Sequence, residues 1–197
     1  MSSTVAPTVS RTAFVEPCFG SSRPKACVNS DKQTEEWWHI GLGVNEVQVC
    51  LDALEYTDLD AFLLAGRYTL LDHAGARPLV EACRMRGASL VVGGVFNSGI
   101  LATGPVEGAL YDYQPATADI LQRTARIQAV CLEFDIDLPT AALQFVLASD
   151  AVSSVLLGVS SERNLARNLS GFRTALPREL WDALVDRELI QGWTRPA

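Results

Sequence analysis

The sequence predicts an α/β protein built around a parallel β-sheet. From residue 39 onward, short apolar segments alternate with amphipathic segments, and this alternation repeats four times. Parallel strands joined by right-handed helical crossovers give this pattern. It fits either an open doubly wound sheet or part of a (β/α)8 barrel, because four units are too few for a closed barrel. No GxGxxG motif stands between a strand and a helix, which counts against a dinucleotide-binding open sheet.

The first two strand–helix units are expected between residues 39 and 87. Strands are predicted at 39–44 (HIGLGV) and 60–65 (DAFLLA). Asn45 is expected to cap the first helix together with Gln48, Pro78 to open the second, and Gly87 to end it. The side chains expected to face the sheet are Val47, Cys50, Leu51, Leu54, Leu79, Ala82 and Cys83.

The last two units follow the same logic with longer connections. Strands are predicted at 89–96 (SLVVGGVF) and 153–159 (SSVLLGV), separated by a loop at 97–108 and helices at 116–134 and 139–147. Ser160 or Ser161 is expected to cap the next helix, and Pro177 to start the last one. The side chains expected to face inward are Ile120, Thr124, Ile127, Cys131, Phe134, Leu165, Leu169, Phe172, Leu180, Trp181, Leu184 and Val185.

Residues 1–38 show neither strand nor helix periodicity, and their charges balance. We expect a poorly ordered leader over 1–38 and one folded unit over 39–197; the alternative is an irregular segment packed across a barrel face. The net charge of −7 arises wholly beyond residue 38, which makes nucleic acid and anionic membranes poor partners.

The five cysteines form no CxxC pair, so we expect neither disulfides nor a metal site, and a reducing, cytoplasmic location. No apolar run is long enough to span a bilayer.

Two loops are candidate ligand sites. Residues 97–99 (NSG) and 160–161 (SS) follow the last two predicted strands, where barrels commonly bind phosphate. Their small side chains let backbone N–H groups approach a pyrophosphate, and a helix N-terminus follows. The spacing alone fits ordinary turn and cap chemistry equally well.

Four segments together resemble the aldo-keto reductases: IGLGVNE, LLAGRYTLLD, VVGGVFNSGIL and VLLGVSSERNLARNL. The branch they are most similar to contains L-fucose (D-threo-aldose) and pyridoxal dehydrogenases, and the likeness runs from about His39 to the C-terminus. The resemblance implies that the four strands are strands five to eight of a (β/α)8 TIM barrel, and that the chain is the C-terminal half of one.

The resemblance also implies an NAD or NADP site. Asn45 matches the residue that binds the nicotinamide carboxamide, and Asn168 matches the adenine-binding position. The segments that match the pyrophosphate and adenosine contacts consist of Phe96, Asn97, Ser98, Gly99, Ile100, Gly158, Val159, Ser160 and Asn164.

Three departures from the family pattern stand out. Ala65 replaces a common glutamine, and Gly93 replaces the tyrosine that stacks on nicotinamide. The positions at 158, 159 and 164 hold no Lys or Arg to bind a 2′-phosphate, which favours NAD, although Arg163 and Arg167 lie nearby.

The resemblance implies carbonyl chemistry that needs a Tyr acid activated by a Lys, with an Asp and a His, all from strands one to four. No catalytic residue is assigned here, because the lysines are only Lys25 and Lys32 and residues 1–38 contain no Tyr. Arg67 and Tyr68 are candidates for the substrate side, or equally a structural ion pair and a packed ring.

We therefore expect a truncated oxidoreductase that keeps its dinucleotide contacts. The alternatives are an enzyme completed by a separate N-terminal half, and a non-enzymatic module that self-associates through its open edges at 39–44 and 153–159.

Overall fold

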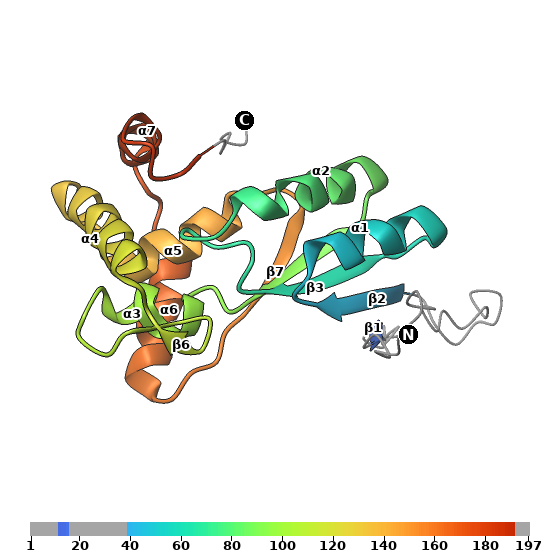
Figure 1. The fold of residues 1–197 in the computed structure, drawn as a ribbon, viewed down its shortest axis with the longest axis horizontal. Coiled ribbons are helices and arrows are strands. Elements are labelled where there is room, and N and C mark those ends of the chain that lie inside the picture. The colour runs from blue at the N-terminus through green and yellow to red at the C-terminus, as the bar shows by residue number, and fades with distance from the viewer. Residues whose placement is uncertain (1–11, 16–38, 192–197) are drawn as a thin grey trace, which may run out of the picture.

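The computed structural model describes residues 12–15 and 39–191, which form an α/β structure around a five-stranded parallel sheet. The strands lie in the order β1 (Thr12–Val15), β2 (His39–Val44), β3 (Ala61–Ala65), β4 (Ser89–Gly93) and β7 (Val152–Leu156). Figure 1 shows the sheet at the centre of the molecule, with helices above it and to its left. The parallel sheet predicted from the sequence is confirmed.

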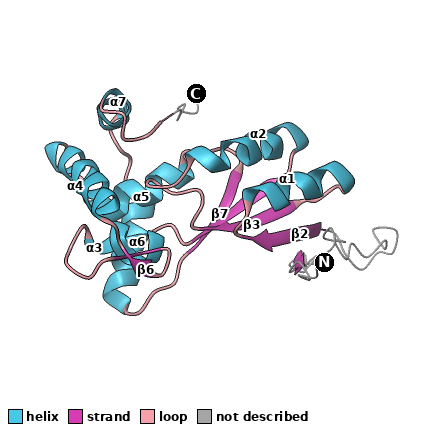
Figure 2. Cartoon of the chain, viewed as in Figure 1, coloured by secondary structure: helices cyan, strands magenta, loops and turns pink. Residues whose placement is uncertain are grey.

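One face of the sheet is buried beneath α1 (Val47–Tyr56) and α2 (Arg77–Arg86) (Figures 1 and 2). Side chains alternate between the two faces of a strand, so one row across the sheet belongs to one face. The row formed by Leu42, Phe62 and Leu90 is buried and aligned by the strand register. Cys50, Leu54, Leu79 and Cys83 close this core from the helices, as the sequence predicts.

The other face of the sheet bears small or partly exposed side chains. Gly43 lies beside Leu63, which lies beside Val91, and Ser154 on β7 continues this row. Leu63 and Val91 are half-buried and Ser154 is exposed. The described helices therefore leave this face incompletely covered.

The remaining helices gather beyond the sheet. They are α3 (Ile100–Thr103), α4 (Ala118–Glu133), α5 (Leu138–Leu147), α6 (Glu162–Arg173) and α7 (Arg178–Asp186). The ring of Phe145 on α5 packs against two other elements. Its centroid lies 5.7 Å from that of Tyr68, which follows β3, and 6.3 Å from that of Trp181 on α7. Aromatic rings at such separations pack favourably.

Several boundaries differ from the prediction. Strand β4 ends at Gly93 rather than residue 96, because Gly94 takes a left-handed φ of +62°. An added Cβ on Gly94 would stand 3.0 Å from the backbone nitrogen of Gly66, so this approach requires glycine. Strand β7 ends at Leu156 rather than residue 159, and the loop predicted at 97–108 contains a 3-10 turn (Asn97–Gly99) and α3.

Two elements were not predicted. Strand β1 falls within the expected leader and pairs in parallel with β2, so β2 is not the sheet edge that the sequence suggested. The other residues of that leader lie outside the described part of the chain. The second element is a hairpin of β5 (Leu110–Tyr111) and β6 (Gln114–Pro115), whose turn residues Asp112 and Tyr113 both have positive φ.

The helix caps agree with the prediction in part. Ser161 caps α6 by accepting a hydrogen bond from the Asn164 N–H, and Gly87 ends α2 with a left-handed φ. Asn45 does not cap α1: the cap position belongs to Glu46, which makes no side-chain cap bond, and Gln48 donates to Asp52 instead.

The predicted inward face of α6 is wrong. Leu165, Leu169 and Phe172 are 44%, 49% and 36% exposed. The helix instead packs on α5 at Gly171, because the missing side chain of this residue permits close contact with Thr140 and Leu143 of α5. On α7, Leu180, Trp181 and Leu184 are buried as predicted, whereas Val185 is exposed.

Candidate functional site

The candidate site residues follow the carboxyl ends of neighbouring parallel strands. Asn45 follows β2, Arg67 follows β3, and the segments 96–100 and 158–160 follow β4 and β7. The register pairs Val44 with Leu64, Ala65 with Gly93, and Gly93 with Leu156, so these strand ends share one edge of the sheet. This is the edge at which parallel α/β sheets bind ligands.

Asn97 has a buried side chain that joins the loops after β3 and β4. Its Oδ1 accepts a hydrogen bond from the Thr69 hydroxyl over 2.6 Å, and its Nδ2 donates to the Gly66 carbonyl over 3.2 Å. Asn97 and Ser98 both have positive φ, a backbone conformation that residues other than glycine adopt only with strain. The amide of Asn97 therefore shapes the loop, and the exposed neighbour Ser98 stands at its surface.

The β5–β6 hairpin is fastened to the same two loops. The Arg67 guanidinium pairs with Asp112 at 3.0 Å and with Asp72 at 3.4 Å, and the Tyr111 hydroxyl donates to Asp72. The hydrogen bond and charge of Asp112 raise the pKa of Arg67. The Tyr113 N–H donates to the Ser98 hydroxyl over 2.9 Å. We call this set of contacts the hairpin clasp.

Tyr68 lies in the core. It is 5% exposed and packs on Phe145, and burial raises the pKa of its phenol. Of the two candidates for the substrate side, only Arg67 lies at the surface, and there it serves the hairpin clasp. Sequence reasoning missed Thr69, Asp72 and Asp112 as partners of these loops, because their contacts span up to 45 positions.

The segment after β7 leads into the N-terminus of α6. Gly158, Val159 and Ser160 are exposed, and the Asn164 amide donates to the Ser160 hydroxyl over 3.1 Å. Ser161 caps the helix, so the first turn of α6 is well defined. A helix start with its exposed N–H groups attracts an anion such as a pyrophosphate.

Two features of these segments fit a dinucleotide. The Oδ1 of Asn168 is buried and has no hydrogen-bond partner within the described ranges, although buried polar atoms are normally paired. That oxygen is the kind of acceptor that an adenine amino group needs. In addition, nothing lies within 4 Å of where a Cβ would stand on Gly99 or Gly158, so their backbone is open to approach.

The two departures from the family pattern on the inner strands are neighbours in space. Ala65 and Gly93 are register partners, and an added Cβ on Gly93 would lie 3.5 Å from the Ala65 Cβ. A large side chain at 93 would therefore stand over residue 65. The two small residues leave room at this point of the edge.

Burial shifts the pKa of several titratable side chains in the direction that favours their neutral form. Burial raises the pKa of Cys50 and Cys131 to about 12 and that of Cys83 to about 11, so these thiols stay protonated. Burial, together with the charge of Arg123, lowers the pKa of His73, whose Nδ1 lies 3.2 Å from the Thr69 carbonyl oxygen. Within the described ranges, no cluster of metal-ligating side chains is found, and no helix is long and apolar enough to cross a bilayer.

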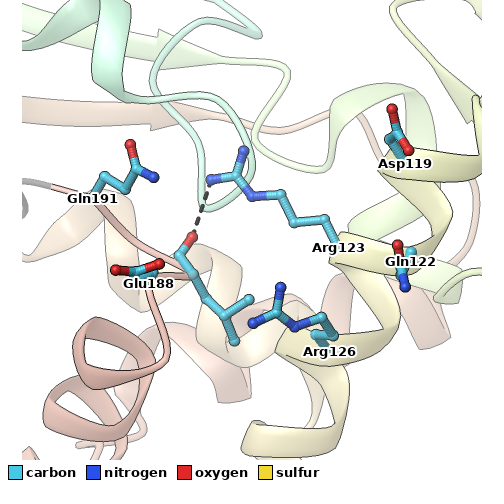
Figure 3. A pocket seen from close by; sticks show the side chains of 7 residues that line it. Asp119, Gln122, Arg123, Arg126, Glu188 and Gln191 are labelled. Atoms are coloured by element: carbon cyan, nitrogen blue, oxygen red, sulfur yellow. Dashed lines mark hydrogen bonds between the residues drawn. The ribbon is translucent and has the colours of Figure 1, made fainter.

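A cavity of about 240 Å³ lies between α4 and the segment after α7 (Figure 3). Arg123 and Arg126 line it, but the first donates to the Leu189 carbonyl and the second to the Arg187 carbonyl. Asp119 and Glu188 also line the cavity, so its formal charges cancel. These contacts indicate that the cavity lies at a joint between α4 and the segment after α7.

The sequence profile of the Aldo/keto reductase family matches residues 38–187. Pyridoxal 4-dehydrogenase from Microbacterium luteolum is 45% identical over 151 residues, which is 77% of this chain and 44% of that protein. D-threo-aldose 1-dehydrogenase from a Pseudomonas species is 36% identical over 152 residues, covering 77% of this chain and 46% of the relative. The chain therefore spans about half the length of these curated relatives.

A solved structure shows the same fold. An aldo-keto reductase from Bacillus halodurans in its apo form superposes with a TM-score of 0.61 at 22% identity, over 79% of this chain and 52% of that one. The likeness extends to the α/β architecture with its parallel sheet.

Proposed function

The chain belongs to the aldo/keto reductase family, as the profile match and the two relatives show, and we propose that it is the part of an oxidoreductase that binds NAD or NADP. The strands β2, β3, β4 and β7 would be strands five to eight of the family barrel, which makes residues 39–197 its C-terminal half. The observation that carries the proposal is the buried Oδ1 of Asn168, which has no hydrogen-bond partner among residues 12–15 and 39–191 and lies in a segment that matches the family.

The dinucleotide would lie along the shared strand edge. Asn45 would bind the carboxamide of the nicotinamide, and Asn168 would accept a hydrogen bond from adenine. The pyrophosphate would lie against backbone N–H groups of the two small-residue loops. The residues proposed for these loop contacts are Phe96, Asn97, Ser98, Gly99, Ile100, Gly158, Val159, Ser160 and Asn164, with Asn97 acting through its backbone and its fixed loop shape.

We favour NAD over NADP. A 2′-phosphate is normally bound by guanidinium or ammonium groups. Positions 158, 159 and 164 hold Gly, Val and Asn, whereas Arg163 and Arg167 are exposed on α6 nearby. Substitution of both arginines should leave NAD affinity within about twofold if they take no part, given the small energies of exposed charges.

When bound, the oxidised dinucleotide would accept the hydride released in an aldehyde or aldose oxidation, and the reduced dinucleotide would supply the hydride for the reverse reduction of a carbonyl. The accompanying proton needs a phenol activated by a cation, because a tyrosine of ordinary pKa near 10 is a poor acid or base at neutral pH. Residues 39–191 contain no lysine. We therefore propose that this chain holds the cofactor and does not by itself turn over pyridoxal or a D-threo-aldose.

Isothermal titration of the full chain with NAD, NADH, NADP and NADPH tests the binding. The variant Asn168→Ala should weaken NAD binding about tenfold, the loss of about one hydrogen bond. Ser170→Ala, an exposed change on the same helix, is the matched control and should have no effect. If none of the four dinucleotides binds at millimolar concentration, the binding proposal fails, whereas turnover by the purified chain would refute only its inactivity.

A further inference from the structure

The carboxyl end of α6 is capped by a side chain from another helix. The Nε2 of Gln144 on α5 donates hydrogen bonds to two carbonyl oxygens of α6, that of Gly171 over 2.7 Å and that of Phe172 over 3.1 Å. The last carbonyls of an α-helix have no partner within the helix, so they need donors from elsewhere. A side-chain amide has two N–H donors, and Gln144 uses both of them on α6.

The same turn of α6 touches α5 at a second point. A Cβ added to Gly171 would stand 3.1 Å from the Thr140 hydroxyl oxygen and 3.2 Å from a Leu143 methyl group. Both residues lie beside Gln144 on α5, and most of α5 is buried, so it is a firm support. The close approach sets the distance between the two helices, and the two hydrogen bonds set how α6 is rotated about its own axis.

Asn168 lies one turn before these contacts and on the same face of α6. Residues three apart in a helix are neighbours on its surface, and Asn168 and Gly171 are the two residues of α6 that are buried. The side chain that the proposed function assigns to adenine therefore takes its direction from the turn that Gln144 caps.

A small rotation of α6 would be enough to displace the Asn168 amide. A helix with its side chains is about 10–12 Å wide, so a side-chain atom about 5–6 Å from the axis moves by about 2 Å when the helix turns by about 20°. The distance between donor and acceptor in a hydrogen bond varies by only about 0.5 Å. A helix α6 that was free to rotate would thus lose a contact between Asn168 and a bound base.

We propose that Gln144 is a positioning residue for adenine recognition: its two hydrogen bonds hold α6 in the rotation that aims the Asn168 amide oxygen at the adenine amino group. The inference rests on the proposed function, in which Asn168 is the residue that binds adenine. Gln144 acts through the backbone of α6 rather than by contact with the dinucleotide.

Titration of the full chain with two dinucleotides tests the inference. The first is NAD, and the second is its analogue in which hydrogen replaces the 6-amino group of adenine, so that only the donor to Asn168 is missing. The wild-type chain should bind NAD about tenfold more tightly than the analogue, the value of about one hydrogen bond. Asn168→Ala should bind the two about equally. Gln144→Met keeps the length of the side chain and removes both donors, so the preference for NAD should fall to about threefold or less.

Two further variants separate positioning from a general loss of stability. Gln144→Lys restores a donor to the last carbonyls of α6 and should restore the preference for NAD. Gln128→Met changes another half-buried glutamine, on α4, and as the matched control should keep the wild-type preference. A ratio of two affinities cancels any equal loss of folded protein. The full wild-type preference in Gln144→Met would overturn the inference.

NMR spectra of the chain without dinucleotide separate failure of the inference from failure of the proposed function. The side-chain amide resonances of Asn168 should shift in Gln144→Met and stay in place in Gln128→Met. If the wild-type chain binds neither dinucleotide, or binds both equally, the proposed adenine contact fails, and these resonances decide whether Gln144 positions Asn168. Unchanged Asn168 resonances in Gln144→Met would overturn the inference in either case.

Discussion

The Thr69 hydroxyl donates a hydrogen bond to the buried Oδ1 of Asn97 over 2.6 Å, across 28 positions of sequence. The same hydroxyl accepts a hydrogen bond from the Asp72 N–H over 2.9 Å. The Thr69 side chain therefore stabilises both the turn in which it lies and the loop that follows β4. The two residues adopt this arrangement at the strand edge that carries the candidate site. Their contact determines the shape of the segment that contains Ser98 and Gly99.

The variant Thr69→Val should lower the free energy of unfolding by about 1–3 kcal/mol. The substitution keeps the volume of the side chain but leaves the Asn97 oxygen buried without a donor, which costs its desolvation. Urea denaturation at a fixed protein concentration measures the change. The control Thr103→Val removes an exposed hydroxyl and should change stability by less than about 0.5 kcal/mol. Equal losses in both variants would contradict a special role for Thr69.

The variant Gly171→Ala should destabilise the packing of α6 on α5. The added Cβ would lie 3.1 Å from the Thr140 hydroxyl oxygen and 3.2 Å from a Leu143 methyl group, and both residues are buried. Overpacking of this kind outweighs the helix propensity gained from alanine, so we expect a net loss of about 1 kcal/mol. Ser170→Ala on the exposed side of the helix gains propensity without the contact. A Gly171→Ala chain that is more stable than wild type would contradict this expectation, because it would show that α5 shifts readily to accommodate the added methyl group.

The buried thiols should make the protein less stable at high pH. The pKa of Cys83 is about 11 in the folded chain, above the value of about 8.5 for an exposed thiol. The unfolded chain therefore loses this proton first, so the contribution of the Cys83 thiol to stability is constant below about pH 8.5 and is lost as the pH rises above that value. Cys83→Ala should reduce that slope by about 1.4 kcal/mol per pH unit. The exposed control Met85→Ala on the same helix should leave the slope unchanged.

His73 should make the protein less stable in acid. Its folded pKa lies below the ordinary value of about 6.5, chiefly because the ring is buried. When the pH falls below about 6.5, the unfolded chain binds the proton more readily, so the free energy of unfolding decreases. His73→Gln should flatten this dependence between pH 7 and pH 5. Parallel pH profiles for wild type and His73→Gln would contradict the assignment.

The regular elements were predictable because their patterns are local. The apolar run 39–44, the residue pair Pro78 and Gly87, and the cap at Ser161 each report on neighbours within one strand or turn, and the structure contains all of them. The face of α6 was not predictable in this way. Leu165, Leu169 and Phe172 have the sequence spacing of a buried helical stripe, yet they are exposed. The contact of α6 with α5 depends instead on Gly171, whose role becomes visible only when Thr140 and Leu143 are placed beside it.

The candidate site was predictable as a set of segments but not as a set of contacts. Small residues after β4 and β7 signal where backbone can approach a ligand. The partners of Asn97, Arg67 and Ser98 come from other loops, and the hairpin turn that supplies two of them has the sequence Asp-Tyr rather than the Asn-Gly or Asp-Gly that usually announces such a turn. The strand β1 was missed because four residues are too few to establish a period.

The hairpin clasp ties three separate loops into one body. Arg67, Asp72, Asp112 and Ser98 come from three connections, and none of these connections can leave its place without breaking bonds in the other two. Regions joined in this way fluctuate together rather than singly. The backbone amides around the hairpin clasp, from Gly66 to Tyr113, should therefore become exposed to solvent in one concerted opening. The rate of that opening would limit how quickly a ligand bound beneath the hairpin turn can dissociate.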